Sequence, residues 1–118
     1  MKRGEVWTVS GGAYAGTRLR QGASPWREPR PAVILQDDRF DATASVTLCV
    51  FTTDETEAPL FRLVVEPSAR NGLRQTSRLM IDKITTAPKE RLGDHIGNLD
   101  AEDMVRLNRA VLVFLGLA

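Results

Sequence analysis

The sequence has very little cysteine and histidine, two residue types that many enzymes use for catalysis. Its 118 residues include one cysteine, Cys49, and one histidine, His95. A single histidine excludes the pair of histidines that serves as acid and base in many small nucleases. It also adds nothing toward a metal site, so we expect no metal and no other cofactor. Cys49 lies in an apolar run and is predicted to be a small buried hydrophobe, because an internal disulfide needs a second cysteine.

Several motifs that would mark other functions are also missing. The chain has no glycine-rich phosphate loop, no Gly-x-Ser-x-Gly turn and no His-Glu-x-x-His helix. Nucleotide hydrolysis, serine hydrolysis and zinc proteolysis are therefore unsupported. No stretch approaches the roughly 18 apolar residues of a membrane span, and the N-terminus lacks the apolar region of a secretory signal. We therefore expect a cytoplasmic protein without membrane contact.

The composition is that of an ordinary globular protein, with 42% apolar and 26% charged residues. At this length we expect one domain that spans residues 1–118 and has a single core. The net charge of +1 argues against a general nucleic-acid coat protein. A groove that contacts a few phosphates needs only a few well-placed cations, so local basic surfaces stay possible.

An arginine between two prolines is the most informative local feature. Arg30 lies between Pro29 and Pro31 and leads into an apolar run that ends at Leu35. Pro29 has a fixed φ, and Pro31 restricts Arg30 to an extended backbone. A strand that begins here would present a permanent cation at its start. The alternative is an ordinary solvated or ion-paired arginine, which base rates favour for any single arginine.

The apolar pattern predicts several short strands and one helix. The strands are expected at residues 5–9, 31–36, 45–52, 60–66 and 78–84, with a tight turn at Asn71-Gly72. Short strands at these spacings indicate a small, antiparallel, strongly curved sheet or partial barrel. Asp100 is the expected N-cap of a C-terminal helix. Its broad apolar stripe consists of Met104, Val105, Leu107, Val111, Leu112, Phe114 and Leu115. Most of this stripe should lie on the sheet, and the remainder could serve a two-fold interface.

Residues 11–29 form a long predicted loop, a type of segment that is often functional in a compact domain. Trp26 and Arg27 in this loop suit single-stranded nucleic acid, because bases stack on aromatic rings while arginines follow phosphates. The alternative is a mobile lid, and the sequence favours neither.

Four short motifs in order resemble the MazF/PemK family of toxin ribonucleases. They are Lys2–Trp7 (KRGEVW), Arg30–Leu35 (RPAVIL), the pair Thr52-Thr53, and Arg91–Asp94 (RLGD) before the C-terminal helix. The resemblance covers nearly the whole chain, although the family's usual Gly-Ser-Glu-Gln type sequence before the arginine is absent. It implies an SH3-like barrel with short helices. It also implies a homodimer, single-stranded RNA as substrate, and an antitoxin whose acidic tail occupies the RNA groove.

RNA can be cleaved without a protein nucleophile, because its own 2′-hydroxyl attacks the adjacent phosphodiester. The enzyme must then stabilise negative charge on the phosphate, for which the planar guanidinium of Arg30 is suited. A threonine hydroxyl at the end of the neighbouring strand could help. Strand alternation allows only one of Thr52 and Thr53 to meet Arg30, and the family position selects Thr52 as catalytic. Thr53 and Asp82 are candidate substrate contacts, and a structural ion pair is the alternative for Asp82.

Two other functions remain open at this point. A non-enzymatic toxin like the CcdB-type gyrase poisons would share the fold and would use neither Arg30 nor Thr52, because fold does not determine function. An RNA-binding module that has lost activity would bind and protect RNA. The sequence thus predicts a sequence-selective, metal-independent endoribonuclease toxin, with these two alternatives.

Overall fold

A long central strand organises the sheet of this computed structural model, which describes residues 1–11 and 29–118. This strand, β3, runs from Ser45 to Thr52. The other strands are β1 (Glu5–Val9), β2 (Arg30–Ile34), β4 (Arg62–Val65), β5 (Ser77–Met80), β6 (Thr85–Pro88) and β7 (Leu92–Asn98). Three short 3-10 helices, η1 (Asp38–Phe40), η2 (Ile81–Lys83) and η3 (Lys89–Arg91), and the C-terminal helix α1 (Ala101–Phe114) complete the described part.

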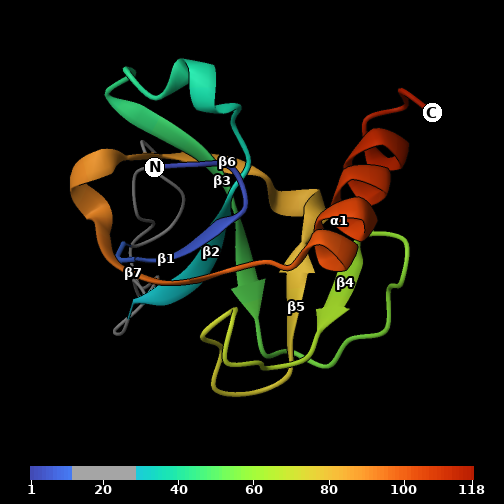
Figure 1. Cartoon of the computed structure of the whole chain (residues 1–118). Coiled ribbons are helices and arrows are strands. Elements are labelled where there is room, and N and C mark those ends of the chain that lie inside the picture. Colours follow the sequence, from blue (N-terminus) through green and yellow to red (C-terminus); the bar gives the residue numbers. More distant parts are fainter. Residues whose placement is uncertain (12–28) are drawn as a thin grey trace, which may run out of the picture.

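All strand pairs are antiparallel, in the order β4-β5-β3-β2-β1-β7. Along one edge, the first half of β3 pairs with β6 and its last two residues pair with β5. The sheet bends where β3 changes partner, so the seven strands form a partial barrel (Figure 1). The predicted fold class, a mainly β SH3-like partial barrel with a C-terminal helix, is confirmed.

Apolar residues fill both faces of β2 and β3, which explains their continuous hydrophobic runs. Val33, Cys49 and Phe51 belong to the core cluster that includes Leu107 of α1. Their neighbours in sequence point to the opposite face and build a second cluster inside the curved sheet: Ala32, Ile34, Leu48 and Val50 with Val9, Val46, Met80 and Ala87. Cys49 is fully buried as predicted, and burial raises the pKa of its thiol to about 12, so the thiol is inert at neutral pH.

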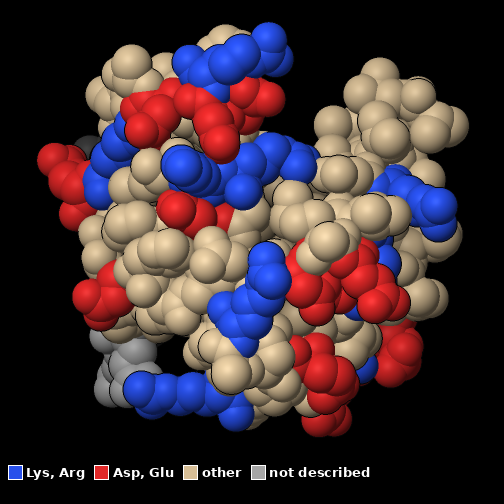
Figure 2. Space-filling view, in the orientation of Figure 1, with Lys and Arg blue, Asp and Glu red and all other residues tan. Residues whose placement is uncertain are grey.

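Helix α1 begins as predicted, with Asp100 accepting a hydrogen bond from the backbone N–H of Asp103 at 2.8 Å. The prediction that most of its apolar stripe lies on the sheet is wrong. Leu107 is buried, and Met104 and Val111 pack against the core. The C-terminal half extends past the sheet (Figure 1) and leaves Leu112, Val113 and Phe114 exposed. Val105 in the first half and Leu115 just after the helix are exposed as well. Figure 2 shows this end of α1 as a projection without charged side chains.

The C-terminal third of the sheet differs from the prediction. The strand expected at 78–84 is β5 followed by η2, and the sequence did not predict β6 or β7. β6 contains a proline, and β7 (LGDHIGN) has two glycines and only two apolar residues, so neither shows the alternation of a half-buried strand. The strand expected at 60–66 is shorter, Arg62–Val65. Within the described ranges, no helix is long and apolar enough to cross a membrane.

Candidate active site

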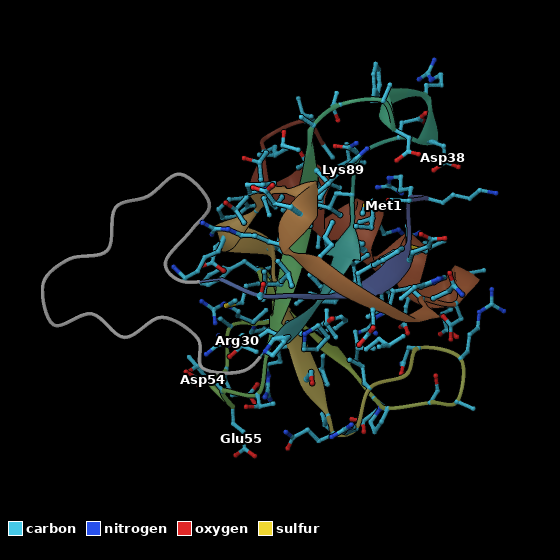
Figure 3. All side chains as sticks on the ribbon, turned by 90° about the vertical axis from the view of Figure 1, so that its left-hand side faces the viewer. Met1, Arg30, Asp38, Asp54, Glu55 and Lys89 are labelled. Carbon is cyan, nitrogen blue, oxygen red and sulfur yellow. The ribbon has the colours of Figure 1, made fainter. Side chains whose placement is uncertain are left out.

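A small open pocket lies at the end of the curved sheet where β3 ends. It has a volume of about 140 Å³ and is lined by Arg30 and Pro31 of β2, Phe51 and Thr52 of β3, Thr53, and Ser77 of β5. The two residues predicted for catalysis, Arg30 and Thr52, therefore line one cavity although they are far apart in sequence. Figure 3 shows Arg30 at this end of the molecule, together with Asp54 and away from Met1 and Lys89.

Strand register explains why Arg30 and Thr52 meet. Ala32 of β2 pairs with Val50 of β3. The same antiparallel register, continued by two residues, puts Arg30 opposite Thr52 on the same face of the sheet. Ala32 and Val50 are almost completely buried, with 0% and 3% exposure, whereas Arg30 is exposed. The Arg30–Thr52 pair thus lies one residue pair beyond the buried interior of the partial barrel.

Arg30 is the first residue of β2, as its position between two prolines predicts. It pairs with Val9 of β1, and Pro31 pairs with Thr8. Because Pro31 has no N–H to donate, a place near the start of the strand costs the sheet little. The backbone on both sides of Arg30 is therefore restricted, and its guanidinium extends from a fixed point.

Both threonines line the pocket. β3 ends at Thr52, and Thr53 follows it in irregular backbone. The Thr52 hydroxyl accepts a hydrogen bond from the backbone N–H of Asp54 at 3.2 Å, which leaves its own O–H free to donate. Thr53 therefore stays a candidate substrate contact at this pocket.

Asp82 lies outside this pocket and takes part in an ion pair. Its carboxylate accepts two hydrogen bonds from Arg62, at 2.9 and 3.2 Å, and Lys83 lies 3.7 Å away. Burial raises the pKa of Asp82, but the hydrogen bonds and charge of Arg62 outweigh this effect and hold the pKa below its usual value. In the structure Asp82 therefore forms the ion pair that the sequence analysis gave as the alternative to a substrate contact. Two other predicted contacts, Trp26 and Arg27, lie outside the described residues.

A second arginine that the sequence analysis missed flanks Thr52. Arg78 of β5 pairs directly with Thr52 across the strands. Its guanidinium donates to the backbone carbonyl of Asp54 at 3.3 Å and to the carboxylate of Glu57 at 3.2 Å. Only the register of β3 with β5 reveals this arrangement, because β5 gives no local signal beyond its apolar residues. No group of three or more potential metal ligands occurs in residues 1–11 and 29–118.

Comparison with known proteins places the chain among toxins. The sequence matches the family described as "PemK-like, MazF-like toxin of type II toxin-antitoxin system" over residues 2–115. It is 50% identical over 119 residues to a probable endoribonuclease MazF of Mycolicibacterium smegmatis, which covers 100% of this chain and 99% of the relative. It is 31% identical over 120 residues to the endoribonuclease EndoA of Bacillus subtilis, with coverage of 99% and 96%.

A solved structure shares the fold. It is an endoribonuclease in complex with its cognate antitoxin from a mycobacterial species, with a TM-score of 0.73 and 24% identity, and the match covers 100% of this chain and 97% of that one. The names of these relatives do not favour the non-enzymatic alternative. With a family match across almost its entire length and a relative at 50% identity, the chain belongs to the PemK-like, MazF-like family of toxins from type II toxin-antitoxin systems.

Proposed function

We propose that this toxin is a sequence-selective endoribonuclease that cleaves single-stranded RNA in the pocket formed by Arg30 and Thr52. The observation that carries the proposal is their position: a cation at the start of β2 and a hydroxyl at the end of β3 line one open pocket. The names of the relatives, endoribonuclease MazF and endoribonuclease EndoA, support the reaction class. Such an enzyme acts in the cytoplasm, where its RNA is found.

The proposed reaction uses the RNA's own nucleophile. The 2′-oxygen attacks the adjacent phosphorus and loses its proton, the bond from phosphorus to the 5′-oxygen breaks, and that oxygen gains a proton. The products are a 2′,3′-cyclic phosphate and a 5′-hydroxyl. Negative charge grows on the two non-bridging oxygens, and the Arg30 guanidinium presents two parallel N–H donors that match them. The Thr52 hydroxyl donates to the phosphate or orients the ribose.

Cleavage should not need a metal ion, because the guanidinium and the hydroxyl supply the charge stabilisation. We expect full activity of the purified protein on a long defined RNA in excess EDTA, with new 5′ ends at a recurring short sequence. Mapping these ends by primer extension measures the selectivity at the same time. Activity that disappears with the chelator and returns with magnesium would contradict the mechanism, and bound but intact RNA would favour an inactive RNA-binding module.

We also propose that the toxin is a homodimer, because α1 exposes a contiguous set of apolar side chains. Val113, Phe114 and Leu115 are 54%, 46% and 55% exposed, and the Phe114 ring lies 6.4 Å from that of Phe61, itself partly exposed. Closed two-fold pairing is the commonest way to bury such a surface. Light scattering at micromolar concentration should give twice the mass of the 13.1 kDa chain. A species with the mass of one chain would contradict this proposal.

The proposed inhibitor is an antitoxin with an acidic tail. The mycobacterial structure with the same fold contains a cognate antitoxin. An acidic segment that is disordered when free would bind in the RNA groove and fold there, and pairing with cations such as Arg30 would offset the cost of ordering. Because RNA and this tail would occupy the same groove, they exclude each other.

A further inference from the structure

We propose that Arg78 is a second phosphate-binding residue, which holds the RNA backbone beside the phosphate at Arg30. This inference rests on the proposed function and adds to it a residue on another strand. Arg78 does not line the pocket itself. It lies at the pocket's edge, next to Ser77 and opposite Thr52, which both line the pocket.

Three strands carry the arrangement. Thr52 pairs with Arg78 on one side, and the register of β2 with β3 puts Arg30 opposite it on the other. Residues that lie opposite each other on neighbouring strands point to the same face. The sheet therefore presents arginine, threonine and arginine in one row, across β2, β3 and β5.

The row lies directly outside the buried interior. Two positions further into the same strands, and therefore on the same face, lie Ala32, Val50 and Met80, with 0%, 3% and 8% exposure. Because strands lie about 4.8 Å apart, the two arginine backbones are separated by roughly 10 Å. Two long side chains at this separation can contact neighbouring phosphates of one strand, with Thr52 between them.

The present partners of Arg78 are typical of an anion-binding group in its unliganded state. The side chain is 13% exposed and its guanidinium is held by the Asp54 carbonyl and the Glu57 carboxylate. Glu57 itself is 82% exposed, so this ion pair is weak and easily exchanged. A phosphate offers the same planar pair of oxygens with the same charge. Glu57 thus occupies the place that the RNA backbone would take.

The segment after β3 is acidic, and this gives Glu57 a second role. Asp54, Glu55 and Glu57 follow the pocket residue Thr53 without an intervening base. Figure 3 shows Asp54 and Glu55 at the same end of the molecule as Arg30. RNA must displace the Glu57 carboxylate from Arg78 before its phosphate binds, so Glu57 competes with the substrate.

Two neutralising substitutions, Arg78→Gln and Glu57→Gln, test this inference because their expected effects have opposite signs. The probe is a single-stranded oligonucleotide of the cleaved sequence with 2′-O-methyl riboses, which binds without being cut because the nucleophile is blocked. Arg78→Gln should weaken binding about tenfold, the loss expected for one charge-assisted hydrogen bond. It should also lower the slope of log Kd against log salt by about 0.7. Glu57→Gln should tighten binding.

Controls separate charge from structure. Arg78→Lys keeps the cation and should restore most of the affinity. Glu55→Gln removes the same charge from the same segment at a residue that makes no ion pair with Arg78, so it should change Kd less than Glu57→Gln does. In cleavage of unmodified RNA, Arg78→Gln should raise KM more than it lowers kcat, because Arg30 and Thr52 remain.

The outcomes separate the two proposals. If Arg78 only stabilises the fold through Glu57, both substitutions will lower the melting temperature and shift Kd in the same direction, or not at all, and the inference is overturned. A loss of affinity in the folded Arg78→Gln protein together with a gain in Glu57→Gln supports it. If the parent protein binds RNA without cleaving it, the proposed function fails, while the binding arms still test Arg78.

Discussion

Replacing Arg30 by alanine should lower the rate of RNA cleavage by about 100-fold or more, because one preorganised donor to a developing oxyanion is worth roughly 3–4 kcal/mol. Arg30 is the first residue of β2 and lines the pocket. Its interaction with the phosphate is strongest in the transition state, where the negative charge is largest. The measurement is a single-turnover rate on one short RNA.

The fold should survive this substitution. Arg30 is exposed, and removing an exposed side chain usually changes stability by no more than about 0.5 kcal/mol. A melting curve therefore separates loss of catalysis from unfolding. Arg30→Lys should not restore the rate, because an ammonium group cannot present two parallel donors. Arg39→Ala is the matched control, since it removes another exposed cation from η1, outside the pocket.

The same assay tests the role assigned to Thr52. Thr52→Val keeps the shape and strand preference while it deletes the hydroxyl, so we expect a smaller but clear loss of rate with RNA binding largely kept. Thr53→Val is a comparison and not a neutral control, because both threonines line the pocket. Near-normal rates for both Arg30→Ala and Thr52→Val in folded protein would remove the assigned active site.

The parts of the fold that the sequence predicted are those set by strong local signals. The continuous β-branched and apolar runs gave β1 and β3 with their observed ends, and Asp100 marked the start of α1. The constraint on the backbone of Arg30 was also local, because the prolines on either side of it restrict the backbone in any tertiary environment. These signals predicted that Arg30 and Thr52 lie at strand ends, and the register of β2 with β3 brings the two residues together.

Features that depend on distant contacts could not be predicted in this way. β7 has little apolar character, and it becomes a strand through its pairing with β1. The partners of Asp82 and Arg78 follow from folded geometry, since Arg62 and Glu57 lie 20 and 21 residues away in sequence. The exposed half of α1 is a further example. Its apolar stripe predicts that the helix packs against another surface, but the stripe does not identify that surface.

Gly72→Ala should destabilise the protein by about 3 kcal/mol or more, although Gly72 lies outside the pocket. The Asn71-Gly72 turn is pressed against β7: a Cβ on Gly72 would lie 2.1 Å from the carbonyl oxygen of Ile96. The turn cannot easily move away, because the N–H of Asn98 donates to the Arg70 carbonyl at 2.8 Å. Asn71, 3% exposed, is held by hydrogen bonds to three backbone groups of the same loop.

The backbone angle alone does not account for an effect of this size. Gly72 has φ of +72°, and alanine in this left-handed region costs roughly 1–2 kcal/mol. Gly116, just after α1, has nearly the same φ, +75°, but beyond its own stretch of chain the described residues place nothing within 4 Å of the position of its missing Cβ. Gly116→Ala is therefore the matched control, and the difference between the two variants measures the clash with β7.

Thermal melting of both variants provides the measurement. Gly72→Ala should melt roughly 10 °C or more below the parent, and Gly116→Ala only slightly below it. Equal shifts would show that the contact between the turn and β7 relaxes freely. Because the turn contributes no residue to the pocket, the folded fraction of Gly72→Ala should cleave RNA at the parent rate. Arg30→Ala should do the opposite, so a loss of activity at unchanged melting temperature assigns a residue to the chemistry and not to the fold.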